Sequence, residues 1–444
     1  MARTAERRRD TPQQRGWYVY DWANSSFPTT VGTVFFGPYL IAVAEGSVDA
    51  AGRVSLLGIP VAPQQLFFIA LALSALLQVF ALPIVGAFAD RSTRKRRWLA
   101  GTAYTGAALT MAMFLVVPGR WQLGFVLILV ANLAFSASIV VYDSFLPEIA
   151  DPDDRDRVSS RGWAFGYIGG GLLLALNLAL YLFDPLGDEG LTVRISLGSA
   201  GLWWALFTIV PLRRLEDGPA LHGGDARGGV VSGAFRELRA TMRQLSEYPE
   251  TVKYLVAFLL FNGGVGTVIY AAGSYATEEL GIEIATLTAA ILMVQFVAFA
   301  GALVLGALAR RAGAKQVVLW SLALWSAVVV YGRFVPAGNV PVFFALAAAI
   351  GFVLGGTQAL SRSLYSHLVP PQREAEFFGF YQISDRGTSV LGQLGFVFAY
   401  GIAGSYRQAL LVLIVFFIAG GLMLLVTDFR KGIDAVGNPQ PAVL

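Results

Sequence analysis

Long apolar runs alternate with short polar connections along almost the whole chain. A bilayer core about 30 Å thick needs about 20 apolar residues per helix, and twelve candidate spans meet that criterion. They cover approximately 17–43, 64–89, 97–117, 121–146, 160–183, 193–212, 251–276, 286–309, 315–335, 340–366, 376–402 and 406–427. The pattern predicts an all-α polytopic membrane protein with 12 transmembrane helices.

The longest polar interruption, 213–250, follows the sixth span and divides the chain into two sets of six. Within it, Phe235, Leu238, Met242 and Leu245 repeat at helical spacing beside a row of arginines. This spacing predicts a basic amphipathic helix along the membrane surface; the alternative is a solvated linker with chance periodicity. We expect the following segments: an N-terminal tail 1–16, a six-helix half 17–212, a linker 213–250, a second six-helix half 251–427 and a C-terminal tail 428–444.

The two halves resemble each other at three places separated by a nearly constant distance along the chain. The echoes pair Gly86 with Gly306, Asp143 with Arg362, and Gly162 with Gly379. Matching features at a fixed separation indicate a parallel duplication of six helices. The sequence therefore predicts two pseudo-symmetric halves.

Composition and charge agree with this class and give it an orientation. Of the residues, 56% are hydrophobic and only 14% are charged, against about 25% in soluble domains. If both termini are cytoplasmic, most of the 33 lysines and arginines lie in cytoplasmic segments. Two lie inside spans, Arg362 and Arg386, and the outer connections hold only Arg53, Arg120, Arg194, Arg333 and Arg407. The positive-inside rule favours this topology, in a bacterial plasma membrane. The net charge of +4 reflects this topology, and because no aromatic-basic pattern on a soluble domain accompanies it, we expect no nucleic-acid partner.

Several chemistries are excluded at this stage. The chain has no cysteine, and its two histidines, His222 and His367, are isolated, so we expect no metal site and no cofactor. A GxxxxGK[ST] phosphate loop is absent from the sequence, so energy must come from a gradient or transport is passive. No span carries a paired catalytic constellation, and we do not expect an enzyme.

Several motifs carry a family resemblance. The loop motif GxxxDRxxRK at 86–95, with twelve spans in two sets of six, resembles the major facilitator superfamily, although Thr93 replaces the usual second glycine. YDWANSSF (20–27), YDSFLPEIA (142–150), SSRGWAFGYIGGG (159–171) and the segment 358–387 look like the branch of autophagy-linked vacuolar amino-acid effluxers and their bacterial relatives. The resemblance covers nearly the whole chain. It implies a secondary transporter, with amino-acid export as the family activity.

The first span carries a polar stripe. On a helix Asp21, Asn24, Ser25 and Pro28 fall on one face, while bulky apolar side chains cover much of the rest. We expect this stripe to face a central cavity. The alternative is that Asp21 only caps or solvates the helix entrance, where a carboxylate suits the helix dipole.

Other charges also lie within spans, where an ionisable side chain costs about 2.5–3.5 kcal/mol at the helix centre. They therefore need a cavity, a partner or a solute. The candidates are Asp143, Arg362, Asp385 and Arg386, with Asn262 and Gln358 as hydrogen-bonding partners of a solute. We expect Asp21 and the pair Asp385–Arg386 to face one cavity, where a carboxylate can exchange a proton.

Two further groups have structural roles in the transport cycle. The loop residues Gly86, Asp90, Arg91, Arg94 and Lys95 predict a cytoplasmic gate whose charges pair when that side is closed; the alternative, plain positive-inside charge, leaves Asp90 unexplained. Gly162, Gly166 and Gly170, at four-residue spacing, predict close helix packing, which we expect against a helix of the other half.

These observations predict a monomeric secondary transporter that moves a small polar or zwitterionic solute by alternating access. A solute carrying both charges suits a cavity that offers carboxylates beside arginines. Two alternatives stay open: a sugar or glycoside transporter of the same fold, and a membrane receptor or scaffold that does not transport.

Overall fold

The structure is a computed structural model that describes residues 9–218, 243 and 245–444, without the side chains at 387–394, 397 and 403. The amphipathic helix expected near 235–245 lies almost entirely outside the described residues. The helices of the N-terminal part are α1 (Pro12–Asn24), η1 (Phe27–Phe35), α2 (Phe36–Glu45), α3 (Pro63–Arg91), α4 (Lys95–Ala112), η2 (Met113–Leu115), α5 (Trp121–Asp143), α6 (Leu146–Ile149), η3 (Pro152–Asp154), α7 (Arg155–Phe183) and α8 (Glu189–Arg214).

The C-terminal part is also helical. Its elements are α10 (Pro249–Ser274), η4 (Tyr275–Glu279), α11 (Ile284–Ala312), α12 (Ala314–Arg333), α13 (Val340–His367), α14 (Glu374–Ala403), α15 (Tyr406–Ala409), η5 (Leu410–Val412), α16 (Leu413–Val426) and α17 (Phe429–Val436). Among the described residues, eleven helical segments are long and apolar enough to cross a membrane, and the 30-residue α14 is a further long helix. Each predicted span coincides with one of these segments to within several residues.

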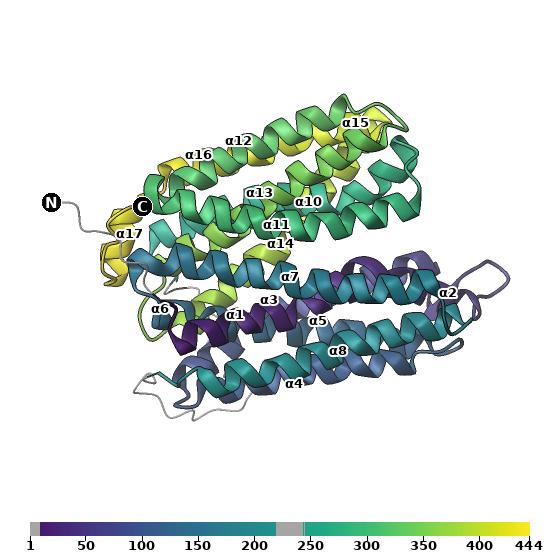
Figure 1. Cartoon of the computed structure of the whole chain (residues 1–444), viewed down its shortest axis with the longest axis horizontal. Coiled ribbons are helices and arrows are strands. Elements are labelled where there is room, and N and C mark those ends of the chain that lie inside the picture. The colour runs from purple at the N-terminus through teal and green to yellow at the C-terminus, as the bar shows by residue number, and fades with distance from the viewer. Residues whose placement is uncertain (1–8, 219–242, 244) are drawn as a thin grey trace.

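The long helices run side by side in two groups (Figure 1). The purple-to-teal group comprises α1 to α8 and the green-to-yellow group comprises α10 to α17, and α7 lies where the groups meet. Buried apolar side chains form two clusters, one built almost wholly from residues of α1 to α8 and the other from residues of α10 to α17. Each group therefore packs around its own core, and we call the groups the N-half and the C-half.

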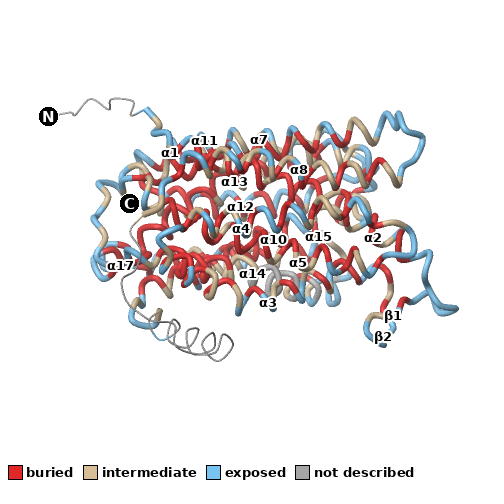
Figure 2. Tube along the Cα trace, turned by 90° about the horizontal axis from the view of Figure 1, so that it is seen from below, coloured by how far each residue is buried: buried red, intermediate tan, exposed pale blue. Residues whose placement is uncertain are grey.

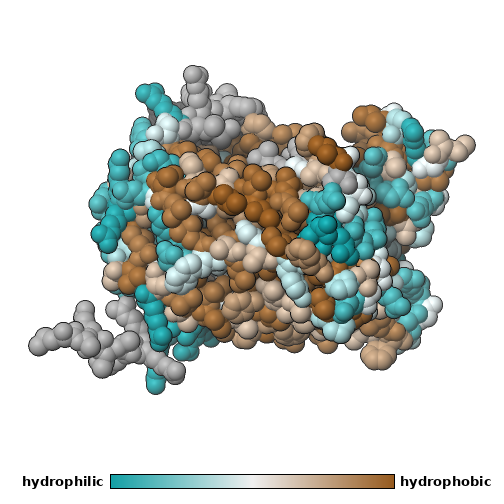
Figure 3. Space-filling model, turned by 90° about the horizontal axis from the view of Figure 1, so that it is seen from above, coloured by the Kyte–Doolittle hydropathy of each residue, from teal (hydrophilic) through white to brown (hydrophobic). Residues whose placement is uncertain are grey.

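The surface matches a membrane protein. On the face that Figure 3 shows, a broad apolar belt covers most of the middle of the molecule, and hydrophilic residues gather mainly toward the two ends. The buried positions lie on the inner sides of the helices, and many outward positions are exposed, including Leu176 at 62% and Leu422 at 58% (Figure 2). Exposed leucines on a helical bundle of this kind are suited to contact with lipid.

The start of α1 and the C-terminal end of the chain lie at the same end of the molecule, which we call the terminal end (Figure 1). The opposite end carries a hairpin of β1 (Val54–Leu56) and β2 (Ile59–Val61), whose antiparallel register pairs Val54 with Val61 (Figure 2). Its turn places Leu57 and Gly58 at φ values of 52° and 86°, as a tight hairpin turn requires.

The C-terminal tail contacts both halves at the terminal end. The Asn438 side-chain amide donates to the carbonyl oxygens of His367 and Val369 at 2.9 and 2.8 Å, which satisfies backbone acceptors at and just beyond the end of α13. Further on, the backbone N–H of Ala442 donates to the carboxylate of Asp153 in the N-half at 2.6 Å. The tail thus bridges the halves.

The first span is not a uniform helix. Its α-helical hydrogen bonding gives way to the π-helical segment η1, which includes Pro28. Proline has no N–H to donate to the preceding turn, and π-helical turns accommodate such interruptions and are frequent at functional sites. The change of geometry begins immediately after the polar group Asp21, Asn24 and Ser25.

Candidate functional site

Arg362 of α13 lies between two carboxylates of the N-half. Its Nη2 donates to Asp21 Oδ2 at 3.1 Å, and its Nη1 donates to Asp143 Oδ1 at 3.0 Å. The side chains of Arg362, Asp21 and Asp143 are 3%, 10% and 2% exposed. Two carboxylates therefore share one guanidinium where water is largely excluded, an arrangement that is tolerable only with good geometry and further hydrogen bonds. We call these three residues the ion cluster.

Hydrogen bonds complete the coordination of the ion cluster. The Tyr142 hydroxyl donates to Asp21 Oδ2 at 2.7 Å, and Gln382 Nε2 donates to the second carboxylate at 3.3 Å. Ser159 accepts from the guanidinium through its hydroxyl at 3.0 Å and through its carbonyl oxygen at 3.1 Å. Residues from both halves thus hold the charges in one arrangement.

Aromatic rings enclose the guanidinium. Its central carbon lies 4.5 Å from the ring centroid of Trp17 and 5.4 Å from that of Trp163, distances at which the ring faces attract a cation. Trp17 is itself fixed, because it stacks on Tyr142 at 4.5 Å and its indole N–H donates to the Tyr142 carbonyl at 3.0 Å. The aromatic cage compensates part of the hydration that the guanidinium loses on burial.

The glycine strip of α7 makes room for the ion cluster. A Cβ atom at Gly162 would lie 2.5 Å from Asp21 Oδ2, one at Gly166 would lie 2.7 Å from Ser25 Oγ, and one at Gly170 would lie 3.0 Å from the Ser25 carbonyl. The strip therefore packs closely against α1, within the N-half. The expectation that these glycines face a helix of the other half is wrong for Gly166 and Gly170, because α1 approaches α7 along this face. Gly162 also lies against the other half, since its Cβ position is 2.9 Å from Arg362 Nη2.

Hydrogen bonds join the two halves next to the ion cluster. They run from the first turns of α7 to the last turns of α13, at the terminal end. The donor–acceptor pairs are Ser159 Oγ to Ala359 O at 2.6 Å, Arg155 Nη1 to Ser366 O at 2.9 Å, and Ser363 Oγ to Asp156 Oδ1 at 2.5 Å. Together with the ion cluster, these contacts form what we call the terminal seam.

The predicted gate residue Asp90 also joins the halves. Its two carboxylate oxygens accept the backbone N–H groups of Ala375 and Glu376, at 3.0 and 2.8 Å, in the first turn of α14. A carboxylate at a helix N-terminus satisfies unpaired donors and complements the helix dipole. Gly86 allows this approach, because a Cβ there would lie 2.3 Å from the Ala375 carbonyl oxygen.

The basic residues of the same loop are arranged differently. Lys95 is buried, and its ammonium lies 2.6 Å from Glu148 Oε1 but 3.9 Å from Asp90 Oδ1. Arg91 and Arg94 are exposed. The hydrogen bonds that hold Asp90 across the halves thus come from the α14 backbone, while Lys95 ties the start of α4 to Glu148 of α6 and to the Ser144 carbonyl at the end of α5.

A second polar network lies within the C-half. Gln358 Nε2 donates to Asn262 Oδ1 at 2.7 Å, and Asn262 Nδ2 donates to Asp385 Oδ1 at 2.8 Å. Arg386 Nε lies 3.7 Å from Asp385 Oδ2, and these two side chains are 32% and 28% exposed. The guanidinium of Arg386 also lies 5.8 Å from the ring centroid of Phe135, which belongs to the N-half. We call Gln358, Asn262 and Asp385 the amide–carboxylate chain.

The structure distributes the predicted site residues over two networks. Asp21, Asp143 and Arg362 form the ion cluster, whereas Asp385 lies in the amide–carboxylate chain beside Arg386. The networks adjoin at α14, since Gln382, one turn before Asp385, contacts Asp143.

On the α1 stripe, Asp21 is directed into the ion cluster, and the neighbouring polar residues differ from it. Asn24 is buried and its amide donates to the Tyr20 carbonyl of its own helix at 2.8 Å. Ser25 is half-buried against Gly166, and Pro28 is exposed.

Several residues of the terminal seam were not singled out from the sequence. Tyr142 and Ser159 lie within motifs that carried the family resemblance, so their positions were visible but their roles were not. Asp156 begins α7 among many charges of a polar connection, where nothing distinguishes it. Gln382 lies one turn before Asp385, and this spacing was the available signal.

The amino-acid sequence matches one family model and is similar to several known proteins. A family model described as "Vacuole effluxer Atg22 like" matches residues 9–437. The "Uncharacterized MFS-type transporter YxiO" of Bacillus subtilis is 30% identical over 424 residues, covering 94% of this chain and 95% of that protein. "Autophagy-related protein 22-1" of Penicillium rubens is 26% identical over 448 residues, covering 82% of this chain and 75% of that protein.

Solved structures share the fold at low sequence identity. The transporter FucP in the outward conformation gives a TM-score of 0.68 at 12% identity, over 94% of this chain and 98% of that one. A bacterial homologue of the iron transporter ferroportin in the outward-facing state gives 0.64 at 12% identity, over 93% and 98%. The predicted all-α polytopic fold is confirmed. This multi-pass integral membrane protein belongs to the Atg22-like family of the major facilitator superfamily, as its sequence motifs predicted.

Proposed function

We propose that the chain moves a small polar or zwitterionic solute across the membrane by alternating access, with export of an amino acid as the leading candidate. The observation that carries this proposal is the contrast between the terminal seam and the amide–carboxylate chain. The seam joins the halves through buried charges at one end. In the amide–carboxylate chain Asp385 is partly exposed, as is the adjacent Arg386, and Asp385 lies about 16 Å along α14 from its start at 1.5 Å per residue, near the middle of the membrane.

The amide–carboxylate chain has the chemistry of a zwitterion site. Asp385 is a carboxylate that can accept the ammonium of an amino acid, and Arg386 is a guanidinium that can pair with its carboxylate. Asn262 fixes the rotamer of Asp385, and Gln358 fixes Asn262 in turn. A charged pair at this depth with partial exposure is best explained by a position facing a solute pathway between the halves.

The ion cluster supplies a means of coupling to protons. When the halves separate at the terminal end, Arg362 moves with α13, and Asp21 and Asp143 stay with the N-half. Each carboxylate then loses its guanidinium partner, and binding a proton neutralises a charge that is otherwise costly in this environment. Closing the seam reverses the step, because Arg362 favours the ionised carboxylates.

We further propose that the termini face the cytoplasm, in a bacterial plasma membrane, with Asp90 and Lys95 belonging to the cytoplasmic gate. In this orientation the structure is closed toward the cytoplasm. A single polypeptide supplies both sides of the terminal seam, and we propose that the protein acts as a monomer.

The test is uptake and efflux by vesicles that contain the purified protein, with a panel of amino acids, peptides and sugars, with and without a pH gradient. We expect accumulation of one or more amino acids that collapses when the pH gradient is dissipated. Transport of sugars alone would replace the amino-acid proposal with the sugar alternative. Absence of any flux across the panel, with correctly inserted protein, would favour a receptor or scaffold.

A further inference from the structure

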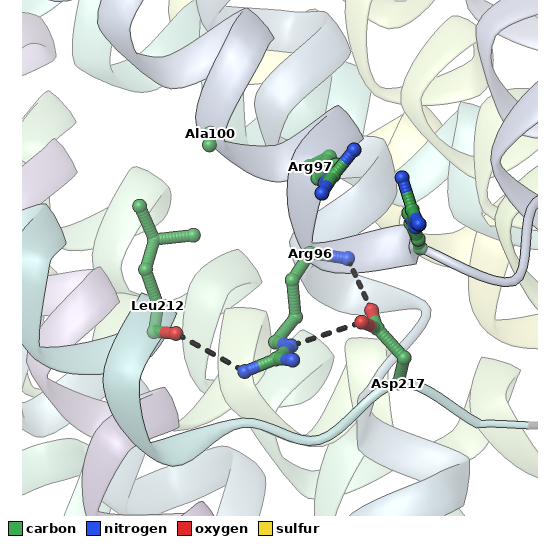
Figure 4. A pocket seen from close by; sticks show the side chains of 6 residues that line it. Arg96, Arg97, Ala100, Leu212 and Asp217 are labelled. Atoms are coloured by element: carbon green, nitrogen blue, oxygen red, sulfur yellow. Dashed lines mark hydrogen bonds and ion pairs between the residues drawn. The ribbon is translucent and has the colours of Figure 1, made fainter.

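A pocket lies between the terminal ends of α4 and α8, away from the ion cluster and the amide–carboxylate chain (Figure 4). Its volume is about 290 Å³, and its lining residues are Arg94, Arg96, Arg97, Ala100, Leu212 and Asp217. The two helices pack on each other and on α1, α5 and η1, all in the N-half, and they lie at the edge of the molecule in Figure 1. The pocket therefore opens toward the surroundings of the protein.

The pocket is rich in guanidinium groups. Arg96 Nε lies 3.1 Å from Asp217 Oδ2, and the Arg96 backbone N–H donates to Oδ1 of the same carboxylate at 2.7 Å. The side chains of Arg94 and Arg97 are exposed, and within the described part of the chain the structure gives neither of them an acidic partner. Three positive charges thus face one negative charge. Guanidinium groups match the geometry of phosphate oxygens and bind them with paired hydrogen bonds.

The other side of the pocket is apolar and continues along the membrane belt. Ala100 and Leu212 belong to the lining, and a Cβ atom at Gly101 would meet nothing within 4 Å. On α8, Leu202, Leu206 and Ile209 are exposed at helical spacing, which places them on one face that leads toward the pocket end of the helix. The polar pocket therefore adjoins an exposed apolar surface, so that a lipid could place its headgroup in the pocket and its acyl chains along that surface.

We propose that this pocket binds the headgroup phosphate of an anionic phospholipid in the leaflet at the terminal end, with the acyl chains along the exposed face of α8. Basic pockets between transmembrane helices at the cytoplasmic side bind such headgroups, with about 1 kcal/mol of attraction for each arginine or lysine near the surface. The proposal rests on the membrane fold and is independent of the transported solute.

The experiment is native mass spectrometry of the full-length protein in detergent, titrated with phosphatidylglycerol or with phosphatidylcholine of the same acyl chains. Wild type is expected to bind phosphatidylglycerol more tightly. The double variant Arg96→Gln/Arg97→Gln is expected to weaken the first phosphatidylglycerol site by about tenfold or more, as loss of two nearby charges implies. The matched control is Arg310→Gln/Arg311→Gln, which removes two exposed arginines from the terminal end of α11 and is expected to leave that site unchanged within about twofold.

A second variant keeps the test decisive if the double variant does not fold. Asp217→Asn removes the negative charge of the pocket and is expected to tighten phosphatidylglycerol binding while leaving phosphatidylcholine binding unchanged. The proposal would be overturned by any of three results. The Arg310→Gln/Arg311→Gln control could weaken phosphatidylglycerol binding as much as the pocket variant does, wild type could bind the two lipids with equal affinity, or Asp217→Asn could leave phosphatidylglycerol binding unchanged. Displacement of the lipid by millimolar inorganic phosphate alone would identify a free anion as the ligand and would also overturn it.

Discussion

The ion cluster and the amide–carboxylate chain use the same kinds of residue in opposite ways. In the ion cluster, side chains from both halves meet, and every charge is at most 10% exposed. In the amide–carboxylate chain, Asp385 and its neighbour Arg386 are about one-third exposed, and the hydrogen bonds that link Gln358, Asn262 and Asp385 lie within the C-half. Under the proposed alternating-access mechanism, the buried contacts across the boundary of the halves are the ones expected to break, and the partly exposed pair with its fixed rotamers is the one expected to meet the solute.

The largest expected effect comes from Arg362→Gln, which leaves two buried carboxylates without their cation. Removing one partner of a buried ion pair costs about 3–5 kcal/mol. We expect a lower melting temperature and opening of the terminal seam. The chain has no cysteine, so a single Ser366→Cys substitution at a fully buried position of α13 reports that opening through thiol labelling.

Arg362→Lys is the control for charge alone, because it keeps the cation and loses the paired hydrogen bonds. Its labelling should lie between wild type and Arg362→Gln. Labelling of Ser366→Cys at the wild-type rate in the Arg362→Gln background would show that the ion cluster does not close this end.

Asp385→Asn tests the ligand-site half of the comparison. A hydrogen bond to a charged group is worth about 1.5–3 kcal/mol, so the KM for an amino acid should rise by about 10- to 100-fold. The matched variant Asp21→Asn should instead reduce accumulation driven by a pH gradient and spare solute exchange. The two regions would lose their distinct roles if both variants changed KM alike.

Gly162→Ala perturbs the ion cluster without changing any charge. The added methyl group would meet Asp21 Oδ2 and Trp17 Cζ3 at 2.5 Å each, and overpacking of this kind costs about 1–3 kcal/mol. Gly101→Ala is the control, because nothing lies within 4 Å of its Cβ position, and it should stabilise α4 by up to about 1 kcal/mol. The measurement is the melting temperature of the purified proteins, and a stable Gly162→Ala protein would argue that α1 and α7 can separate at little cost.

Asp90→Ala removes the carboxylate that caps α14 and should weaken the seam by about 0.5–2 kcal/mol, the usual worth of an N-cap. Labelling of Ser366→Cys should rise, though less than in Arg362→Gln. Asp90→Asn retains one acceptor oxygen and should fall between wild type and the alanine variant. An unchanged labelling rate in Asp90→Ala would remove Asp90 from the gate.

Asp10 gives the smallest effect and lies outside the membrane spans. Burial raises the pKa of its carboxyl, but the hydrogen bond from Arg157 and the charges of Arg157 and Arg161 outweigh burial, and the pKa is held below the ordinary value of 3.8. The stability that Asp10 provides is therefore present at neutral pH and is lost as the pH falls through its lowered pKa. Wild type should melt slightly above Asp10→Asn at pH 7, and the difference should shrink toward pH 3, whereas Glu45→Gln at an exposed position should show neither effect.

The helices followed from the sequence because their physical cause is local. Twenty apolar residues in a row have one stable arrangement in a bilayer, and each expected span has a helical counterpart. The π-helical segment was not anticipated, although Pro28 is its second residue.

The grouping of the site residues did not follow, because it depends on contacts between distant segments. Asp143 and Arg362 stood out as a pair of repeat positions, yet nothing local shows that the two side chains touch. The partner of Gly166 was misjudged for the same reason: spacing predicts that a flat helix face exists and leaves open which helix covers it.

The C-terminal tail has a practical consequence for anyone who handles this protein. Asn438 is anchored at the end of α13, and Ala442 reaches across to Asp153 of the N-half. A purification tag or fluorescent fusion joined directly after this tail would strain a segment that connects the N-half and the C-half. Long flexible spacers, with the untagged protein as reference, are therefore advisable before transport rates of a fusion are taken as those of the native chain.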